Sequence, residues 1–588
     1  MTREEEIINA INQMCDEDRE AEVVEMIDRL PEEDRTYKIL GLEARTLSNL
    51  AGMIRSGYLE SELDPDELDR RALDILTDTA EEGKDDPNWW CRNGYTRMGL
   101  NMEAEAIGFF EHVMTLIPDD EETQEFWSDV PEAIERCQSI LDFLNNPKQR
   151  ELPYTKQRSV MIAVSRDKTF AADMEDFTGR LATIPGVEGL EFEYMPDNQQ
   201  TRTIERISGL FMGEKFDLDI DRIEDFDSSG MPHGTYLNAT DTALTERLNN
   251  GYGIDIKYGK KNPLAWFHLQ LKIAAMLIPD LLAVCDLSGG QILSGYYVRR
   301  AAQSAIPPSP EFAYNIYTEG NKQGSDIWLY TCGLARFGLP EMEIMHSDTD
   351  HYACHRKLLR TVSSYAIWHP DDKLNETLRL DVPVARMAGD VPLFIRLLPW
   401  PDAIKDGQRD RPAPGSIRTR LSKMNSNSCV LFTYEDEAAQ QEDAYQPLWM
   451  KDDFMTNDNA GDMLLLTSME EQEQSKAMAK QYSWLPEQVA RRNPGKVWLR
   501  LRLANDEGDD EALWARLVSY TDNSNFEIEI DDTPRVLPLD KGDRLRFVDE
   551  SDVNLIKWMV DTEQFNITPE NIYILDAEPK LRQELGIE

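Results

Sequence analysis

Apolar and polar positions follow helical and strand periodicities in turn, and the most apolar stretch lies near the middle of the chain. There, Trp266, Leu269 and Ile273 recur at spacings of three and four residues, which predicts the buried face of a helix. Pro279 ends this helix, because a proline nitrogen cannot donate a hydrogen bond to the preceding turn. The apolar run Leu281 to Leu287 follows, and a run of that length is typical of a strand buried on both faces. We therefore expect a central domain that closes over this helix and strand.

Residues 1–148 have helical periodicity and predict an all-α domain. The clearest signal is a series of small and large apolar residues at spacings of 4, 12, 4, 3 and 5: Trp90, Gly94, Ala106, Phe110, Val113 and Pro118. This spacing resembles the tetratricopeptide repeat, a pair of helices of about 34 residues. The small residues would let two helices touch, and Phe110 would fill the gap to the next repeat. A generic helical hairpin is the alternative.

Two further helical regions and a linker are expected around this repeat. A degenerate helix pair would cover roughly residues 36–84, and a closing helix at 121–145 would cap the array. The locally basic segment 146–157 contains two prolines and is interpreted as a linker to the next domain.

Residues 158–400 alternate between strand and helix patterns and predict an α+β domain. A strand at 159–165, an amphipathic helix at 170–181 and a strand at 190–194 would form a β-α-β unit. Later elements are a hairpin turning at Gly213-Glu214, a strand near 254–258, two strands at 327–330 and 342–344, and a helix after Tyr352. We expect one mixed sheet with helices on one face.

Residues 401–461 are polar, with one apolar island, Val430 to Tyr434. This region is either an insertion or the end of the central sheet. From 462 to 588, an amphipathic helix at 468–484 precedes strongly alternating strands, which predict a small, curved antiparallel sheet with a packed helix. The fold class is therefore multidomain: an all-α helical repeat region, an α+β domain and a small antiparallel β-rich domain.

The charge balance limits the kinds of partner. The 588 residues contain 62 Lys and Arg against 110 Asp and Glu, a net charge of -48, and residues 1–150 alone hold 38 acidic and 15 basic side chains. Such a field repels phosphate backbones and anionic lipids, so we expect neither nucleic acid nor membrane as partner. No apolar run is long enough to span a bilayer, and no secretory segment is expected. The seven cysteines are far apart without a CxxC motif, which favours free thiols in a reducing cytoplasm.

Three blocks together are similar to a known class of proteins: Trp90 to Pro118, Trp328 to Ile344 and Ala512 to Val560. They resemble bacterial multidomain proteins that join tetratricopeptide-type helices to two successive domains of unknown function. The chain departs from that pattern at Lys557, where an acidic residue is expected before Trp558. The resemblance implies a soluble bacterial protein without assigned activity, whose relatives look like interaction or defence-associated proteins, toxin immunity included.

One histidine cluster is a candidate for metal chemistry. Four of the seven histidines lie close together, in a segment that comprises His346, His351, Cys354, His355 and, further along, His369. His351 and His355 are four residues apart and would share a helix face, as zinc ligands can. However, Tyr352 occupies the position of the general-base glutamate in the metalloprotease signature. A metal-dependent hydrolase is thus the alternative hypothesis, and a solvated helix start with no metal is the preferred one.

Other chemical candidates have plainer structural interpretations. Cys332 would need His346 as a base and a third orienting group, so a buried thiol is favoured. Ser288-Gly289-Gly290 lacks the further glycine and lysine of a phosphate-binding loop. Lys541-Gly542-Asp543 and Asp531-Asp532 are expected to be solvated turns. The sequence therefore predicts no catalytic residue and no cofactor.

Recognition remains as the predicted role. In a tetratricopeptide array the groove lies on the first helix of each pair, which selects Asn88, Cys91, Tyr95 and Met98. Flanking acids would suit a basic or amphipathic peptide, whereas an incomplete array would only be a packing platform for the central domain. The leading hypothesis is a non-catalytic bacterial interaction protein that binds another protein through its helical repeats and central domain.

Overall fold

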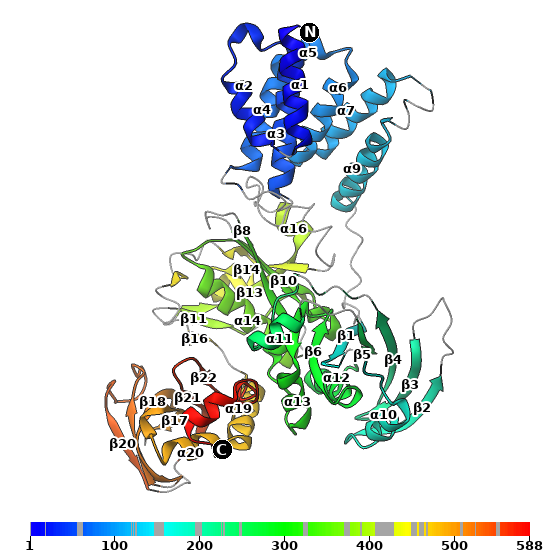
Figure 1. Ribbon diagram of the computed structural model, residues 1–588. Helices are drawn as coiled ribbons and strands as arrows, with labels where there is room; N and C mark the ends of the chain where they lie inside the picture. The colour runs from blue at the N-terminus through cyan, green and yellow to red at the C-terminus, as the bar shows by residue number, and fades with distance from the viewer. Residues whose placement is uncertain are drawn as a thin grey trace. The chain divides into compact units, whose positions relative to one another are not determined.

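The computed structural model divides the chain into two compact units (Figure 1). The first comprises residues 1–150, 320–324 and 401–424, and the second comprises 151–319, 325–400 and 425–588. The structure describes residues 2–587 apart from 18, 56–60, 62, 119, 121–122, 124–125, 146–157, 168, 195–202, 225, 227, 229, 246–249, 321–326, 370–376, 381, 388–390, 406–427, 449–454, 458–463, 466–467, 506–509, 524 and 549–552. The expected linker, 146–157, thus lies outside the described residues.

Helix pairs build the first unit (Figure 1). The pairs are α1 (Arg3–Asp16) with α2 (Glu20–Asp28), α3 (Tyr37–Arg55) with α4 (Pro65–Asp78), and α6 (Pro87–Gly99) with α7 (Glu103–Leu116); α5 (Ala80–Gly83), η1 (Glu32–Asp34) and α9 (Asp129–Asn145) complete the unit. Each second helix packs against its own partner and against the next long helix of the unit: α2 contacts α3, α4 contacts α6, and α7 contacts the closing helix α9. The expected pair at 36–84 is present, and α1 with α2 adds a pair that the sequence did not mark.

Close packing between α6 and α7 follows from the small residues of the repeat. A side chain at Gly94 would place its Cβ 2.5 Å from the ring of Phe110. Phe110 itself is buried in one cluster with Val130 and Ala133 of α9. The aromatic ring therefore joins the α6–α7 pair to the closing helix, as its position in the repeat pattern predicted.

A seven-stranded antiparallel sheet begins the second unit, with strand order β2-β3-β4-β5-β1-β6-β7. Its strands are β1 (Arg158–Ser165), β2 (Val187–Tyr194), β3 (Thr203–Phe211), β4 (Glu214–Glu224), β5 (Asn250–Lys257), β6 (Leu281–Asp286) and β7 (Gln291–Ser294), and its helices are α10 (Met174–Leu181), α11 (Ala239–Thr245), α12 (Pro263–Leu277) and α13 (Gly295–Gln303). The predicted β-α-β elements exist, but β3, β4 and β5 lie between β1 and β2. The β3–β4 turn, with Met212 and Gly213 at φ 51° and 79°, is the tight type that antiparallel hairpins favour. The expected single mixed sheet is therefore wrong for this part.

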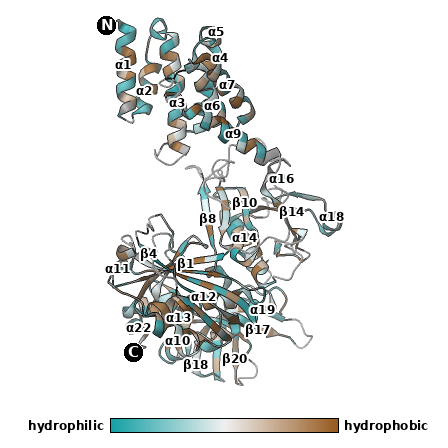
Figure 2. Cartoon of the chain, turned by 90° about the vertical axis from the view of Figure 1, so that its right-hand side faces the viewer, coloured by the Kyte–Doolittle hydropathy of each residue, from teal (hydrophilic) through white to brown (hydrophobic). Residues whose placement is uncertain are grey.

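The predicted central helix and strand form the core of this unit. Hydrophobic residues are concentrated in α12 (Figure 2). Most of α12 is buried around its whole circumference, and all six residues of β6 are buried. Both observations agree with the apolar pattern of residues 264–287.

A second sheet has the order β13-β14-β10-β9-β8, and β15 also pairs with β14. Its strands are β8 (Asn315–Gly320), β9 (Ile327–Cys332), β10 (Glu341–Ser347), β13 (Ile395–Pro399), β14 (Ser428–Tyr434) and β15 (Tyr445–Pro447); nearby lie η2 (Pro310–Phe312), η3 (Leu334–Phe337), α14 (Tyr352–Trp368), α16 (Trp400–Lys405) and α18 (Glu437–Gln441), and a small sheet of β11 (Ala385–Met387), β12 (Val391–Leu393) and β16 (Leu464–Leu465). The predicted strand–turn–strand is β9–η3–β10. β10 pairs in parallel with β14 and antiparallel with β9, so this sheet is mixed.

The apolar island at 430–434 is the middle of this second sheet. β14 is buried along its length and lies between β13 and β10. A domain boundary at residue 400 would separate β13 from the strand with which it pairs. Residues 428–434 therefore belong to the second sheet through hydrogen bonds with β10 and β13, in line with the expected alternative that this region is the end of the central sheet.

The C-terminal part is an antiparallel sheet with the order β20-β19-β18-β17-β21-β22. Its elements are α19 (Met469–Gln481), α20 (Trp484–Ala490), η6 (Pro494–Lys496), β17 (Val497–Ala504), β18 (Asp510–Asp522), β19 (Asn525–Ile530), β20 (Arg544–Phe547), β21 (Leu555–Asp561), β22 (Asn566–Ile567), α21 (Ile574–Ala577) and α22 (Pro579–Leu585). Alternate residues of β17 and β19 are buried, and the indole of Trp558 donates to the Ala479 carbonyl of α19. The predicted small sheet with a packed helix is confirmed.

Candidate functional site

The first helices of the three pairs, α1, α3 and α6, and the closing helix α9 are linked by side-chain contacts along one face of the helical unit. The Arg45 guanidinium of α3 donates to Asn12 of α1 at 3.3 Å, and the Tyr95 hydroxyl of α6 donates to Asp129 of α9 at 2.6 Å. The hydroxyls of Ser48 and Thr96 are 2.8 Å apart and join α3 to α6. Side chains of all four helices therefore meet on this face, which we call the first-helix face.

The four groove residues selected from the sequence lie in different environments. Asn88 is exposed, and Cys91 and Tyr95 are half-buried. Met98 is buried in the cluster that joins α6 and α7 to α9, so it is a packing residue and not part of an open groove. Burial and the nearby Asp129 raise the pKa of the Cys91 thiol to about 12. Of the four residues, Asn88 alone is exposed, and Cys91 and Tyr95 pack against the same cluster as Met98.

Arginines on the first-helix face were missed by the sequence pattern. Arg92 stands one helical turn after Asn88, and its guanidinium fills the space that a side chain at Gly41 of α3 would occupy. Burial, reinforced by the neighbouring Arg45, lowers the pKa of Arg92. Arg136 is exposed on α9. The pairing of Gly41 with Arg92 across two helices had no local signature, although the glycine in a helix interior was a hint of close approach.

The histidine cluster does not converge. His351 Nδ1 lies 2.6 Å from a carboxylate oxygen of Asp348, whereas His355 is buried with its Nδ1 2.9 Å from the Ser347 hydroxyl. The Cys354 thiol donates to the Thr456 carbonyl at 3.1 Å. Within the described ranges, no group of three or more His, Cys, Asp or Glu side chains could hold a metal ion. The geometry gives the hydrolase hypothesis no support.

The other residues that were considered for chemistry make hydrogen bonds or turns within the fold. Cys332 donates to the Ser288 carbonyl at 3.6 Å, and burial raises its pKa to about 12, the opposite of what a nucleophilic thiolate requires. The N–H of Gly289 donates to the buried Asp286, so this loop is held internally. Asp532 accepts the backbone N–H of Trp514, and Gly542 has φ 95°, as a tight turn requires.

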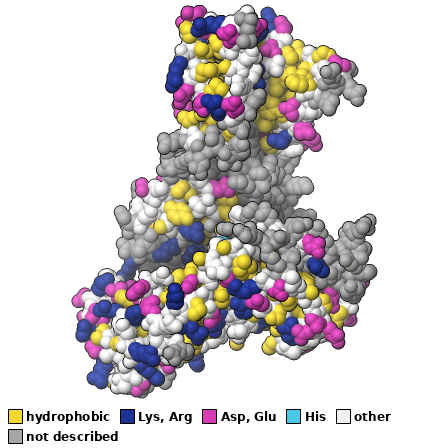
Figure 3. All heavy atoms as spheres, in the orientation of Figure 1, with side chains coloured by type: hydrophobic (Ala, Val, Ile, Leu, Met, Phe, Trp, Pro, Cys, Tyr) yellow, Lys and Arg dark blue, Asp and Glu magenta, His cyan; other side chains and the backbone are white. Residues whose placement is uncertain are grey.

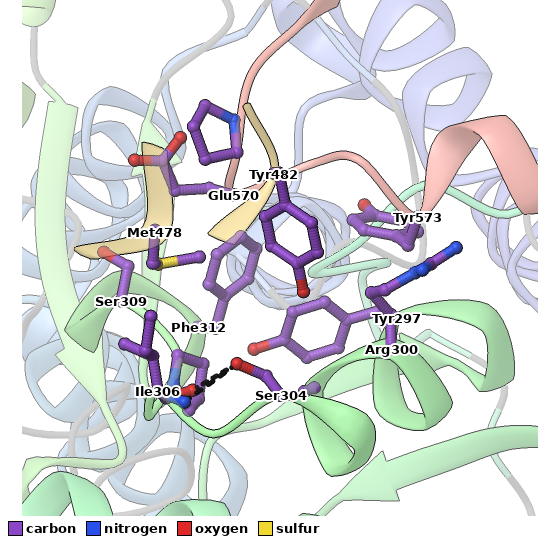
Figure 4. Close-up of a pocket in the computed structure, with 13 residues that line it drawn as sticks. Tyr297, Arg300, Ser304, Ile306, Ser309, Phe312, Met478, Tyr482, Glu570 and Tyr573 are labelled. Atoms are coloured by element: carbon purple, nitrogen blue, oxygen red, sulfur yellow. Dashed lines mark hydrogen bonds between the residues drawn. The ribbon is translucent and has the colours of Figure 1, made fainter. Parts of the chain in front are cut away.

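A small cavity lies where α13 meets the C-terminal elements (Figure 4). Aromatic rings surround it, and Ser304 at its wall donates to the Ile306 carbonyl at 2.8 Å. Its lining includes Tyr297, Phe312, Tyr482 and Tyr573, and its volume is about 20 Å³. That is room for one water molecule and not for an organic ligand. The cavity is therefore an imperfectly filled junction within the second unit.

The described architecture defines a multidomain protein with a helix-pair unit, a central α+β part and a C-terminal antiparallel sheet. Residues 159–308 match the family model for the N-terminal part of a protein of unknown function (DUF4026), and residues 313–432 match the model for its C-terminal part. Comparison with curated proteins and with solved structures finds no match. No helix in the described part of the chain is long and apolar enough to cross a membrane.

Proposed function

We propose that the chain is an interaction protein whose helical unit binds a segment of another protein on the first-helix face. The observation that carries this proposal is the contact between first helices: α1 contacts α3, and α3 contacts α6. These helices thus form one continuous side of the unit, on which Asn88 is exposed and Tyr95 is half-buried. Helix-pair arrays commonly use such a face to hold an extended or helical peptide.

Site-specific crosslinking in the full chain tests this proposal. A photoreactive residue replaces Asn88 on α6, and the control carries it at Glu111, which is exposed on the second helix α7. We expect a discrete crosslinked protein from position 88 and none from position 111. The crosslinked segment, once sequenced and synthesised, must bind the purified chain and suppress crosslinking at position 88.

Two results would count against the proposal. Crosslinking from position 111 with equal yield would place the contact elsewhere. A segment that is captured at position 88 but does not bind when synthesised would show that the first-helix face is not a recognition surface.

A further inference from the structure

Arginines of the helical unit are used in two different ways. Six of them form ion pairs with carboxylates: Arg3, Arg19, Arg29, Arg35, Arg71 and Arg97. Acidic and basic side chains are accordingly interspersed on the visible face of the unit (Figure 3). Among the described residues, Arg45, Arg92 and Arg136 make no ion pair, and neither does Arg70, which is exposed on the second helix α4.

The unpaired arginines are concentrated on the first-helix face. Arg45, Arg92 and Arg136 belong to α3, α6 and α9, in a region where residues 1–150 carry 38 acidic side chains. Three of the unit's four described arginines without an ion pair thus stand on these helices. Arg45, Arg92 and Arg136 are therefore the basic side chains of this face that no carboxylate holds in an ion pair among the described residues.

Two of these arginines are partly removed from water as well. Arg45 and Arg92 are half-buried, and the Nε of Arg45 is buried without a hydrogen-bond partner. Partial removal of a guanidinium from water without a counter-charge costs free energy, and a carboxylate placed against its accessible nitrogens would offset that cost through charge-assisted hydrogen bonds.

The carboxylates beside these arginines are already engaged by tyrosines. Asp86 accepts the Tyr37 hydroxyl at 2.7 Å, and Asp129 accepts the Tyr95 hydroxyl at 2.6 Å. Glu132 stands one turn before Arg136 on α9, is exposed and makes no ion pair with it in the described residues. Among the described residues, none of these acids makes an ion pair with Arg45, Arg92 or Arg136.

We propose that the first-helix face binds an acidic segment of a partner protein, whose carboxylates contact Arg45, Arg92 and Arg136. This inference rests on the proposed function and specifies the charge of the segment. It differs from the basic peptide that the flanking acids suggested, because the side chains that face the ligand are the arginines and not the surrounding carboxylates.

Binding of short labelled peptides to the purified full chain tests the inference by fluorescence anisotropy. Three peptides of equal length alternate alanine with glutamate, with lysine or with serine. We expect binding of the glutamate peptide alone and weaker binding at higher ionic strength. Since the whole chain has a net charge of -48, general electrostatics favour the lysine peptide, so a preference for glutamate reports the local face.

Arginine-to-glutamine variants on different helices test whether the peptide binds at the first-helix face. Arg136→Gln and the double variant Arg45→Gln/Arg92→Gln should each raise the dissociation constant of the glutamate peptide by about tenfold, as expected for loss of a charge-assisted hydrogen bond. Arg70→Gln makes the same charge change on an exposed second helix and should alter affinity by less than about twofold. Arg136 is exposed, so its replacement leaves folding intact, which circular dichroism verifies.

Several outcomes would overturn the inference. These are preferential binding of the lysine peptide, no binding of the glutamate peptide, or equal weakening by Arg70→Gln and Arg136→Gln. If crosslinking from position 88 still yields a partner segment that binds, the proposed function stands and only the acidic character of the partner is wrong.

Discussion

Gly94 and Gly108 lie on the two helices of one pair, and only one of them has room for a side chain. A Cβ at Gly94 would lie 2.5 to 2.7 Å from three ring atoms of the buried Phe110. A Cβ at Gly108, on the exposed side of α7, would meet nothing within 4 Å. The same substitution should therefore have opposite effects at the two positions.

We expect Gly94→Ala to lower the free energy of unfolding by about 1–3 kcal/mol, because the added methyl group overpacks the contact with Phe110. Gly108→Ala should raise it by about 0.5–1 kcal/mol, because alanine restricts the unfolded chain and favours the helix. Denaturant unfolding followed by circular dichroism measures both values. A neutral Gly94→Ala variant would mean that α6 and α7 separate easily, contrary to the close packing described above.

The ion pair between Asp286 and Arg336 is a contact that the sequence pattern could not predict. Their side chains are both fully buried and joined by an ion pair of 2.6 Å, and they come from the two separate family-model regions. Periodicity marks which positions are apolar, and it carries no information about which charged residue meets which across 50 positions. The same limit hid Arg92, whose neighbour Gly41 lies on another helix, whereas Gly94 with Phe110 was predicted because one short repeat contains both.

At the scale of elements, local periodicity predicted much of what the described residues form. α12, β6, β9, β10 and the alternating C-terminal strands were all marked by apolar spacing and turn residues. Sheet order was not, because strands with the same alternation can pair in many orders and only long-range packing selects one. For this reason β14 was recognised as an apolar island but not placed, and β1 and β2 were wrongly treated as the flanks of a simple β-α-β unit.

α19 carries a titratable group whose surroundings make stability depend on pH. Glu471 lies in the first turn of this helix, and its pKa is raised to about 7. Burial is the larger cause, and repulsion by the nearby Glu311 is the second. Glu570 acts in the same direction, while Lys557 and Arg500 oppose the shift. A carboxyl with a raised pKa favours the folded state while it is protonated. This contribution to stability is therefore lost as the pH rises from about 4.5, the ordinary pKa of a glutamate, to about 7, the raised pKa of Glu471.

We expect Glu471→Gln to unfold at a slightly higher temperature than the parent chain at pH 5 and at a clearly higher one at pH 8, with about 3 kcal/mol as the upper limit of the gain in the free energy of unfolding. The control Glu473→Gln changes an exposed carboxylate on the same helix and should shift stability by less than about 0.5 kcal/mol at either pH. Thermal unfolding at the two pH values provides the comparison. Equal effects of Glu471→Gln at pH 5 and pH 8 would contradict the buried, repelled carboxyl.

For the molecule as a whole, the buried hydrophobic clusters divide the chain into domains differently from the sequence patterns. The sequence separates a central and a C-terminal domain, whereas one continuous buried cluster contains Ile254 of the antiparallel sheet and Leu501 of the C-terminal sheet. Polar contacts accompany it: Arg300 of α13 is paired with Asp576, and the Tyr236 hydroxyl donates to Glu578 at 2.6 Å. The helical unit has clusters of its own, one of which contains Leu47.

Scanning calorimetry of three cavity-forming variants tests whether the central and C-terminal sheets unfold together or as separate domains. Ile254→Ala, Leu501→Ala and Leu47→Ala each remove a side chain that is at most 1% exposed, and each should cost about 2–5 kcal/mol. We expect two transitions, because a shared core unfolds cooperatively. The Ile254 and Leu501 variants should then lower the same transition, and the Leu47 variant should lower the other one. A transition that only the Leu501 variant shifts would mean that the C-terminal sheet folds independently, since a core common to both sheets must transmit a cavity in either one to the whole unit.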